Sequence, residues 1–274
     1  MGNPSLHSIH VHPLKAARGF APDEAVVEPW GLAGDRRWVL VDDSGKVITQ
    51  RPHPRMVLAA AGLLPGGGLL LSASGRAPLT VPVPGPTGTV TVEIWQDKVE
   101  AVLADAAAHA WFSDHLGASV RLAHLDDPAT RRPLDPEYAR PGETVSFADG
   151  YPLLLTTLAS LDALNALVAR GDHPEEGPLP MSRFRPNVVV DGTDAWAEDD
   201  WRRVAIGEVT FRVAKMCGRC VVTTTDQETG ERGREPLRTL ARHRRFGDKL
   251  AFGQNLVPES GGTVRIGDPV RILE

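Results

Sequence analysis

Residues 215–230 read KMCGRCVVTTTDQETG and contain both cysteines of the chain, Cys217 and Cys220. A Cys-x-x-Cys pair is typical of structural zinc sites, of thiol–disulfide exchange and of thiolate ligands to other metals. Buried cysteines also serve simply as small apolar residues. The stretch therefore limits the chemistry to four interpretations, and the rest of the chain has to decide between them.

A zinc site needs four ligands, and the chain has no second cysteine pair. His10 and His12 fall on one face of an early strand and complete a Cys2His2 set on paper, although polar side chains of an ordinary strand explain them more simply. Dithiol exchange needs the pair at the start of a helix, whose dipole lowers the thiol pKa. The run VVTTT after Cys220 favours a strand instead. A single metal thiolate is the third interpretation, and Arg219 beside it would favour its deprotonated form.

The composition describes an ordinary globular protein of 274 residues, with 42% hydrophobic and 24% charged residues. A net charge of -5 argues against a general nucleic-acid binder. No apolar run reaches the roughly 18 residues of a membrane span, and the first residues do not resemble a secretory signal. Two cysteines fit a reducing compartment, so a cytoplasmic protein without a membrane partner is expected. Of the 30 basic residues five are lysine and 25 arginine, a bias typical of a GC-rich bacterial genome.

Short strands separated by turn residues dominate the predicted structure, which makes it a β-rich α+β fold with barrel-like domains and flanking helices. Strands are expected in 8–14, 34–52, 65–84, 89–104 (a hairpin around Gln96 and Asp97), 118–125, 151–155, 186–190, 201–214, 221–225 and 261–273. Helices are expected in 105–117, in 157–171 with Thr157 as N-cap and Gly171 as C-cap, and in 235–246. The polar segment 126–150 separates a predicted N-terminal domain, 1–125, from a C-terminal domain, 126–274.

Several further motifs occur in a fixed order around the cysteine pair. FRPNVVVDG (184–192) precedes it, and EPLRTL (235–240), FGQN (252–255) and GDPV (267–270) follow it. VHPLKAARG (11–19), GLAGDRRWVLVDDSG (31–45) and TQRPHPRM (49–56) occupy the N-terminal part. This ordered set resembles a MOSC domain preceded by the MOSC-associated N-terminal β-barrel domain, in the branch of the amidoxime-reducing components. The resemblance extends from about Ile9 to the C-terminus.

The resemblance implies a molybdenum–molybdopterin cofactor whose metal is bound by one protein cysteine. The matching cysteine is Cys220, as metal ligand and catalytic residue, whereas Cys217 matches a cysteine that does not hold the metal. The matching cofactor-binding residues are Lys15, Arg36, Asp149, Gly150, Tyr151, Arg185, Asn187, Gly218 and Arg219. Fixed positive charge suits the phosphate that the pterin carries. Ala16 departs from the family's serine, and Gly150 and Tyr151 replace a pair of small hydroxyl residues.

The implied activity is the reduction of small N-hydroxylated compounds such as amidoximes, from N–OH to N–H, with two electrons and two protons. Two cysteines do not suffice for an iron–sulfur cluster, and no Gly-rich dinucleotide motif opens a helix. Electrons are therefore expected from a separate protein: a ferredoxin, a b-type cytochrome or a flavin reductase. The second interpretation is a carrier that binds the cofactor or holds sulfur as a persulfide on Cys220.

Overall fold

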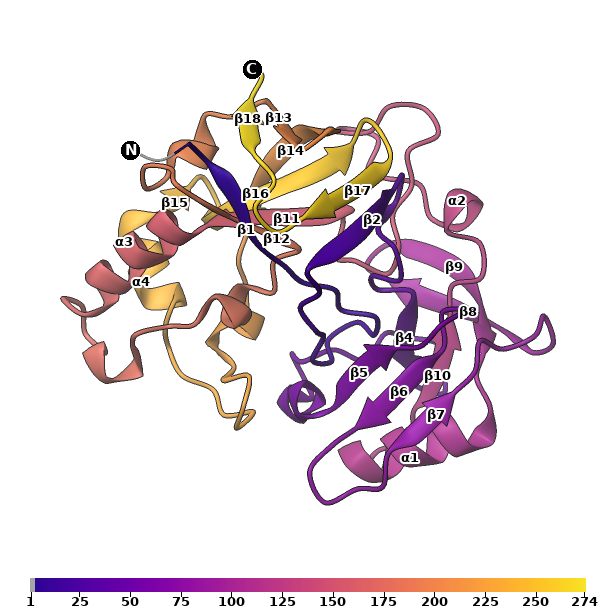
Figure 1. The fold of residues 1–274 in the computed structure, drawn as a ribbon. Helices are drawn as coiled ribbons and strands as arrows, with labels where there is room; N and C mark the ends of the chain where they lie inside the picture. The colour runs from indigo at the N-terminus through magenta and orange to yellow at the C-terminus, as the bar shows by residue number, and fades with distance from the viewer. Residues whose placement is uncertain (1–2) are drawn as a thin grey trace.

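The computed structural model of the chain describes residues 3–274, and strands make up most of its regular structure. Figure 1 shows two lobes, one formed mainly by the orange and yellow C-terminal strands and one by the purple and magenta N-terminal strands. The predicted β-rich α+β class with flanking helices is confirmed. No helix in the described part of the chain is both long enough and apolar enough to cross a bilayer.

The C-terminal lobe is a barrel-like sheet in the order β1-β12-β11-β16-β14-β13-β18, with the short strand β15 added at β16. Its strands are β1 (Ser5–Ile9), β11 (Leu153–Thr157), β12 (Val188–Asp191), β13 (Arg203–Ile206), β14 (Val209–Gly218), β15 (Arg245–Phe246), β16 (Lys249–Pro258) and β18 (Val270–Ile272). The first and last strands meet, because the Leu6 amide donates to the Asp268 carbonyl at 2.9 Å and the Val270 amide to the Pro4 carbonyl at 2.8 Å. Alternating apolar residues such as Leu6, Val190 and Leu256 fill the interior.

The N-terminal lobe contains two smaller antiparallel sheets and a helix. Their elements are β4 (Trp38–Val41), β8 (Thr89–Ile94), β9 (Asp97–Leu103) and β10 (Arg121–His124) in one sheet; β5 (Ala60–Leu63), β6 (Leu69–Ser72) and β7 (Leu79–Val81) in the other; and helix α1 (Ala106–Leu116). A core that includes the fully buried Trp38 and Phe112 joins α1 to both sheets. The β8–β9 turn consists of Trp95 and Gln96, one position earlier than predicted.

Strands from the start of the chain pair with C-terminal strands, so the C-terminal lobe is not one continuous segment of the chain. Strand β1 pairs with β12 of the barrel, and β2 (Glu24–Glu28) pairs both with β17 (Gly262–Arg265) and with β3 (Gly31–Leu32). Figure 1 shows these indigo strands lying beside the orange and yellow ones. The domain boundary at 125/126 stays a prediction. The pairings place β1, β2 and β3 in sheets with C-terminal strands, whereas Leu14 and Ala17, between β1 and β2, pack in the core of the N-terminal lobe.

The predicted range of α1 is confirmed at both ends, whereas α3 and α4 are shorter than predicted. Asp105 caps α1, and Gly117 ends it in the left-handed conformation with φ 66°. Thr157 caps α3 (Leu158–Val168), but its C-cap is Ala169 and the prediction of Gly171 was wrong. The last turn tightens into i→i+3 bonds, so Gly171 lies beyond the helix and donates to the Val168 carbonyl at 2.9 Å. Helix α4 is also shorter than predicted, Leu237–His243, because Arg245 and Phe246 pair with β16.

The predicted strand 221–225 was wrong. Val221–Thr224 form a 3-10 turn, η5, and Cys220 precedes it in an extended conformation. The Thr223 hydroxyl donates to the Cys220 carbonyl at 2.9 Å and the Thr224 hydroxyl to the Val221 carbonyl at 2.8 Å. Threonine side chains thus satisfy the backbone locally, which outweighs the β-propensity of the run.

Candidate functional site

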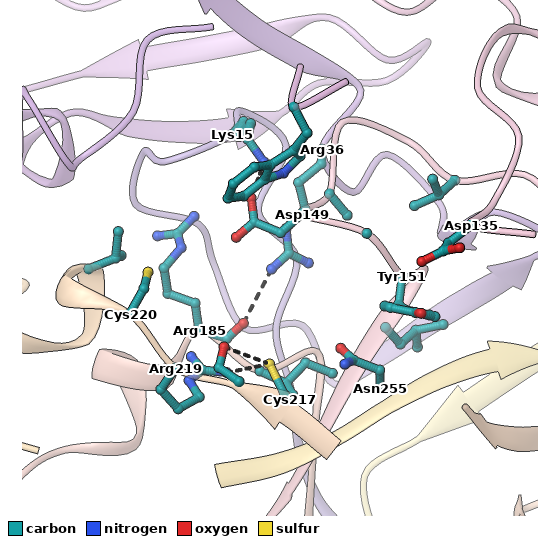
Figure 2. Close-up of a pocket in the computed structure, with 18 of the residues that line it drawn as sticks. Lys15, Arg36, Asp135, Asp149, Tyr151, Arg185, Cys217, Arg219, Cys220 and Asn255 are labelled. Carbon is teal, nitrogen blue, oxygen red and sulfur yellow. Dashed lines mark hydrogen bonds and ion pairs between the residues drawn. The ribbon is translucent and has the colours of Figure 1, made fainter. Parts of the chain in front are cut away.

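One large cavity of about 1030 Å³ lies between the lobes, and both of them contribute to its lining. Figure 2 shows Cys220 on one side of it and Asp135, Tyr151 and Asn255 on the opposite side. The structure brings all ten residues predicted from the sequence to the lining of this cavity: Lys15, Arg36, Asp149, Gly150, Tyr151, Arg185, Asn187, Gly218, Arg219 and Cys220. Whether each residue can bind a cofactor depends on the contacts that its side chain already makes with the protein.

Cys220 is a half-buried free thiol at the point where β14 has ended and η5 begins. Its partner is Arg51 of the N-terminal lobe, whose Nη2 lies 3.6 Å from Cys220 Sγ. Sequence reasoning missed Arg51, although the motif TQRPHPRM contains it. This contact places a hydrogen-bond donor with a fixed positive charge against the Cys220 sulfur.

Cys217 lies on β14 and has a different partner. Arg219 donates from Nη1 to Cys217 Sγ at 2.9 Å and from Nη2 to the Phe184 carbonyl at 2.6 Å. The expectation that Arg219 would assist Cys220 was therefore wrong, because its side chain turns back along the strand toward Cys217. The two sulfur atoms lie apart in Figure 2, and both cysteines are free. A redox dithiol at a helix start also disagrees with the four-residue 3-10 turn found here.

Lys15 and Asp149 form an ion pair on the cavity wall. The Lys15 side chain is 8% exposed, and its Nζ donates to Asp149 Oδ1 at 2.5 Å and to the Phe147 carbonyl at 2.8 Å. The Lys15 ammonium holds the pKa of Asp149 well below its usual range. Burial lowers the pKa of Lys15, and the Asp149 carboxylate opposes that shift. The Asp149 side chain is 73% exposed, so it presents this pair to the cavity.

Arg36 and Asn187 form a bonded cluster behind Lys15. Arg36 Nη1 donates to Asn187 Oδ1 at 2.8 Å and also to Asp35, while Nη2 donates to the Arg185 carbonyl at 3.2 Å. The Asn187 amide, 1% exposed, also accepts from the Leu154 amide at 3.2 Å and donates to the His10 carbonyl at 3.2 Å. The hydrogen bonds of the Asn187 side chain thus go to protein groups, and one of them orients Arg36.

Arg185 is one of the cations on the cavity wall. Its backbone has a positive φ of 53°, a left-handed conformation that is unusual for a residue other than glycine. Among residues 3–274 the Arg185 guanidinium has no hydrogen-bond acceptor, and neither has the ammonium of Lys249, another residue of the cavity wall. Burial, with a smaller contribution from Arg36, lowers the pKa of Arg185 to about 9, so that it remains charged at neutral pH. An unpaired guanidinium on a concave wall is suited to bind an anion.

Tyr151 lies at the end of the cavity far from Cys220. Its hydroxyl is buried without a hydrogen-bond partner in the described structure, and burial raises its pKa. The Lys215 ammonium lies 4.9 Å from the Tyr151 ring and 4.1 Å from the Tyr138 ring, a cation–π arrangement that the sequence did not predict. Nothing lies within 4 Å of the position that a Cβ of Gly150 would take, which leaves the neighbouring wall open.

The structure separates the histidines from the cysteines of the alternative Cys2His2 set. His10 and His12 line a second cavity of about 280 Å³ and not the one that holds the cysteines. His12 is buried with Nε2 3.3 Å from the Pro186 carbonyl, and His10 lies 3.0 Å from the Ser8 hydroxyl. Their placement supports the simpler interpretation as polar residues near an early strand.

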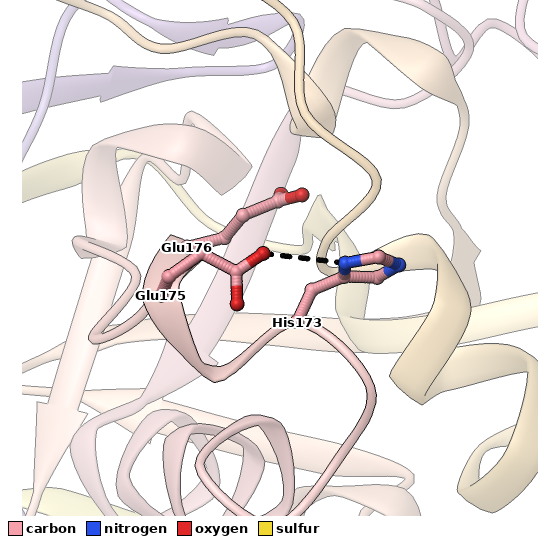
Figure 3. A group of neighbouring side chains, drawn as sticks. All are labelled: His173, Glu175 and Glu176. Atoms are coloured by element: carbon pink, nitrogen blue, oxygen red, sulfur yellow. Dashed lines mark hydrogen bonds and ion pairs between the residues drawn. The ribbon is translucent and has the colours of Figure 1, made fainter.

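One other cluster, His173, Glu175 and Glu176, has side chains spaced as metal ligands are (Figure 3). Glu176 already accepts from the backbone amides of Arg234 at 2.8 Å and Glu235 at 2.9 Å. His173 and Glu175 lie 3.3 Å apart at the surface. The Glu176 carboxylate therefore anchors the loop that leads into α4, and the cluster does not line the Cys220 cavity.

Comparisons with known proteins agree with this arrangement. Residues 3–119 match the MOSC N-terminal beta barrel domain, and residues 142–271 match the MOSC domain. The chain is 32% identical to mitochondrial amidoxime-reducing component 1 of Homo sapiens, a match that covers 98% of this chain and 83% of the human protein. The Mus musculus protein of the same name is also 32% identical, over 98% of this chain and 82% of its own length. The molybdenum cofactor sulfurase of Oryza sativa is 28% identical, and the match covers 90% of this chain and 32% of that protein.

Proposed function

We propose that this chain, which belongs to the family of MOSC-domain proteins with an N-terminal MOSC β-barrel domain, binds a molybdenum cofactor and reduces small N-hydroxylated compounds. One observation supports this proposal above the others. A free thiol, Cys220, and an acceptor-free guanidinium, Arg185, face the same interlobe cavity. A soft thiolate beside anion-binding cations is the donor set that a metal held by a phosphate-bearing sulfur ligand requires.

The residues of the cavity fit that group. Cys220 would bind the metal, and Arg185 would bind the anionic part of the cofactor. Lys15 and Arg36 would add positive charge, with Asp149 and Asn187 orienting them. Gly150, Tyr151, Gly218 and Arg219 would form the surrounding wall. Arg51, absent from the sequence-based set, would stabilise negative charge on the Cys220 sulfur.

When bound, the molybdenum cofactor supplies two-electron chemistry at the metal. Reduction of an N–OH group consumes two electrons and two protons and releases water and the N–H product. The chain contributes the ligand, the binding charges and an enclosed space whose walls come from both lobes. Electrons would come from a separate protein, of the ferredoxin, b-type cytochrome or flavin reductase kind. The cytoplasmic location and bacterial origin expected from the sequence remain predictions, and the relatives are named mitochondrial.

Turnover with defined electron donors tests this function. Protein loaded with cofactor, one molybdenum per chain, should reduce benzamidoxime when reduced viologen supplies the electrons. NADH alone should give no turnover, and NADH with a flavin reductase and a small electron carrier should restore it. A loaded protein that fails with viologen contradicts the proposed reaction. Turnover with NADH alone contradicts the requirement for a partner.

A carrier function is the second candidate, and the similarity to a molybdenum cofactor sulfurase is the observation that favours it. A persulfide carrier should release cyanide-labile sulfur that depends on Cys220. A cofactor carrier should transfer its pterin to an acceptor enzyme. Either result, together with inactivity in the viologen assay, would replace the reductase proposal.

A further inference from the structure

Trp95 occupies an unusual position at the tip of the β8–β9 hairpin. Its φ is 56°, a region that bulky residues rarely adopt and that costs free energy. Its side chain is 61% exposed, so burial of the indole does not offset that cost. It nevertheless lines the interlobe cavity, and of the six tryptophans it is the exposed one. An exposed indole on a strained turn indicates a role other than stability.

The Arg51 guanidinium connects this indole to Cys220. The Arg51 guanidinium lies 4.6 Å from the Trp95 ring centre, and the same guanidinium lies 3.6 Å from Cys220 Sγ. The backbone of Arg51 is fixed in turn, because Arg232 Nη2 donates to its carbonyl at 2.5 Å. The ring is thereby placed at the metal-ligand end of the cavity.

The other side of the hairpin is anchored to the floor of the cavity. Asp97, which follows the turn, accepts from Arg132 Nε at 2.8 Å. Arg132 is buried and donates from Nη1 to the Ser146 and Ala148 carbonyls, directly before Asp149. This ion pair ties the strand that follows the turn to the wall of the cavity.

We propose that Trp95 is a substrate-stacking residue that selects flat, conjugated and uncharged N-hydroxylated compounds, an inference that rests on the proposed function. Aromatic rings bind planar conjugated groups by stacking. Arg51 already occupies the cation-binding position on the indole, and its charge repels a second cation there. A neutral aryl amidoxime fits this wall, whereas an alkyl amidoxime gains nothing from it.

Two substrates with the same reacting group isolate this effect: benzamidoxime and acetamidoxime, assayed with reduced viologen. Trp95→Ala should raise KM for benzamidoxime roughly five- to tenfold and leave acetamidoxime kinetics unchanged. Trp95→Phe should restore most of the affinity. Trp30→Ala is the control, because Trp30 lies outside the cavity with its indole N–H bonded to Glu28 at 2.7 Å. Equal effects of Trp95→Ala on both substrates, or none on either, overturn the proposal.

A binding measurement that does not depend on turnover separates the two proposals. Benzamidoxime should quench tryptophan fluorescence in wild type and in Trp30→Ala, and Trp95→Phe should remove that quenching. If wild type turns over neither substrate but shows Trp95-dependent quenching, the reductase function fails and the stacking site stands. If wild type is active and quenching persists unchanged in Trp95→Phe, the stacking site fails and the function stands.

Discussion

Cys217 and Cys220 are three residues apart, yet the regions around them differ in how they use their polar groups. The contacts of the Cys217 region stay within one lobe, because Arg219 donates both to the Cys217 sulfur and to a carbonyl of the same lobe. Cys220 lies at the lobe interface, and its contact comes from Arg51, 169 positions away in the sequence. The comparison indicates that Cys217 is bonded closely within its own lobe, whereas Cys220 makes a longer contact of 3.6 Å across the lobe interface.

The same difference separates the cations of the cavity. Lys15 is paired with Asp149, and Arg36 is bonded to Asp35 and Asn187. Arg185, which lies on the Cys220 side in Figure 2, has no acceptor among the described residues. Charged side chains that already have a protein partner form the cavity wall. Charged side chains without such a partner are the ones expected to bind the cofactor.

The cysteines provide the strongest test of this comparison. Cys220→Ser should lose nearly all bound molybdenum, because a hydroxyl is a harder and less acidic ligand than a thiol. Cys217→Ser should keep the metal, since the Cys217 sulfur is bonded to Arg219 at 2.9 Å, closer than Arg51 lies to the Cys220 sulfur. Metal and pterin content of purified protein measures both, and thermal unfolding checks that each variant is folded. Equal loss in the two variants would show that both thiols hold the metal.

A second test compares Arg185 with Lys15. A charge-assisted contact is worth roughly 1.5–3 kcal/mol, so Arg185→Ala should loosen the cofactor tenfold or more. Lys15→Ala should also weaken retention, but less, because Asp149 already neutralises part of the Lys15 charge. Pterin remaining after dialysis gives the measurement. Arg271→Ala, an exposed site outside the cavity, is the control. Full retention by Arg185→Ala would place the anionic part of the cofactor elsewhere.

The sequence predicted the parts of this site that short motifs carry. Lys15, Arg185 and Cys220 lie in ordered motifs, and the structure brings all three to one cavity. The contact between Arg51 and Cys220 depends on how the lobes pack, which no local pattern encodes. The partner of Arg219 was missed for a related reason, because proximity in sequence does not fix side-chain direction.

In the fold, too, features set by neighbouring residues were predictable from the sequence, and features set by packing were not. The capping residue Thr157 located the start of α3, and the sequence pattern located both ends of α1. The central strand β16 was missed because Gly253, Gln254 and Asn255 interrupt its apolar pattern. Only the packed barrel explains that glycine: its φ is 79°, and a Cβ there would lie 2.6 Å from the Leu155 carbonyl oxygen of the neighbouring strand. Close approach of two backbones cannot be read from one strand alone.

The smallest expected effect concerns the Lys15–Asp149 pair and its dependence on pH. Asp149→Asn removes the carboxylate partner of a buried ammonium and should lower the free energy of unfolding by about 1 kcal/mol at pH 7, a value reduced for the exposure of Asp149. Because Lys15 holds the folded-state pKa of Asp149 below its unfolded value, the pair stabilises the fold above about pH 4. That contribution is lost as the pH falls through the folded pKa.

The difference between wild type and Asp149→Asn should therefore be constant from pH 7 to pH 5 and shrink below pH 4. Lys15 stays charged over this range, so the carboxyl alone titrates. Urea unfolding at several pH values measures the difference. Asp172→Asn is the matched control, because Asp172 pairs with Arg242 at 2.5 Å on the surface, where both side chains are about half exposed and screened by solvent. The contrary result is a difference in unfolding free energy between wild type and Asp149→Asn that grows as the pH falls. It would mean that Asp149 does not stabilise Lys15, and both residues would then count among the cavity groups without a stabilising partner.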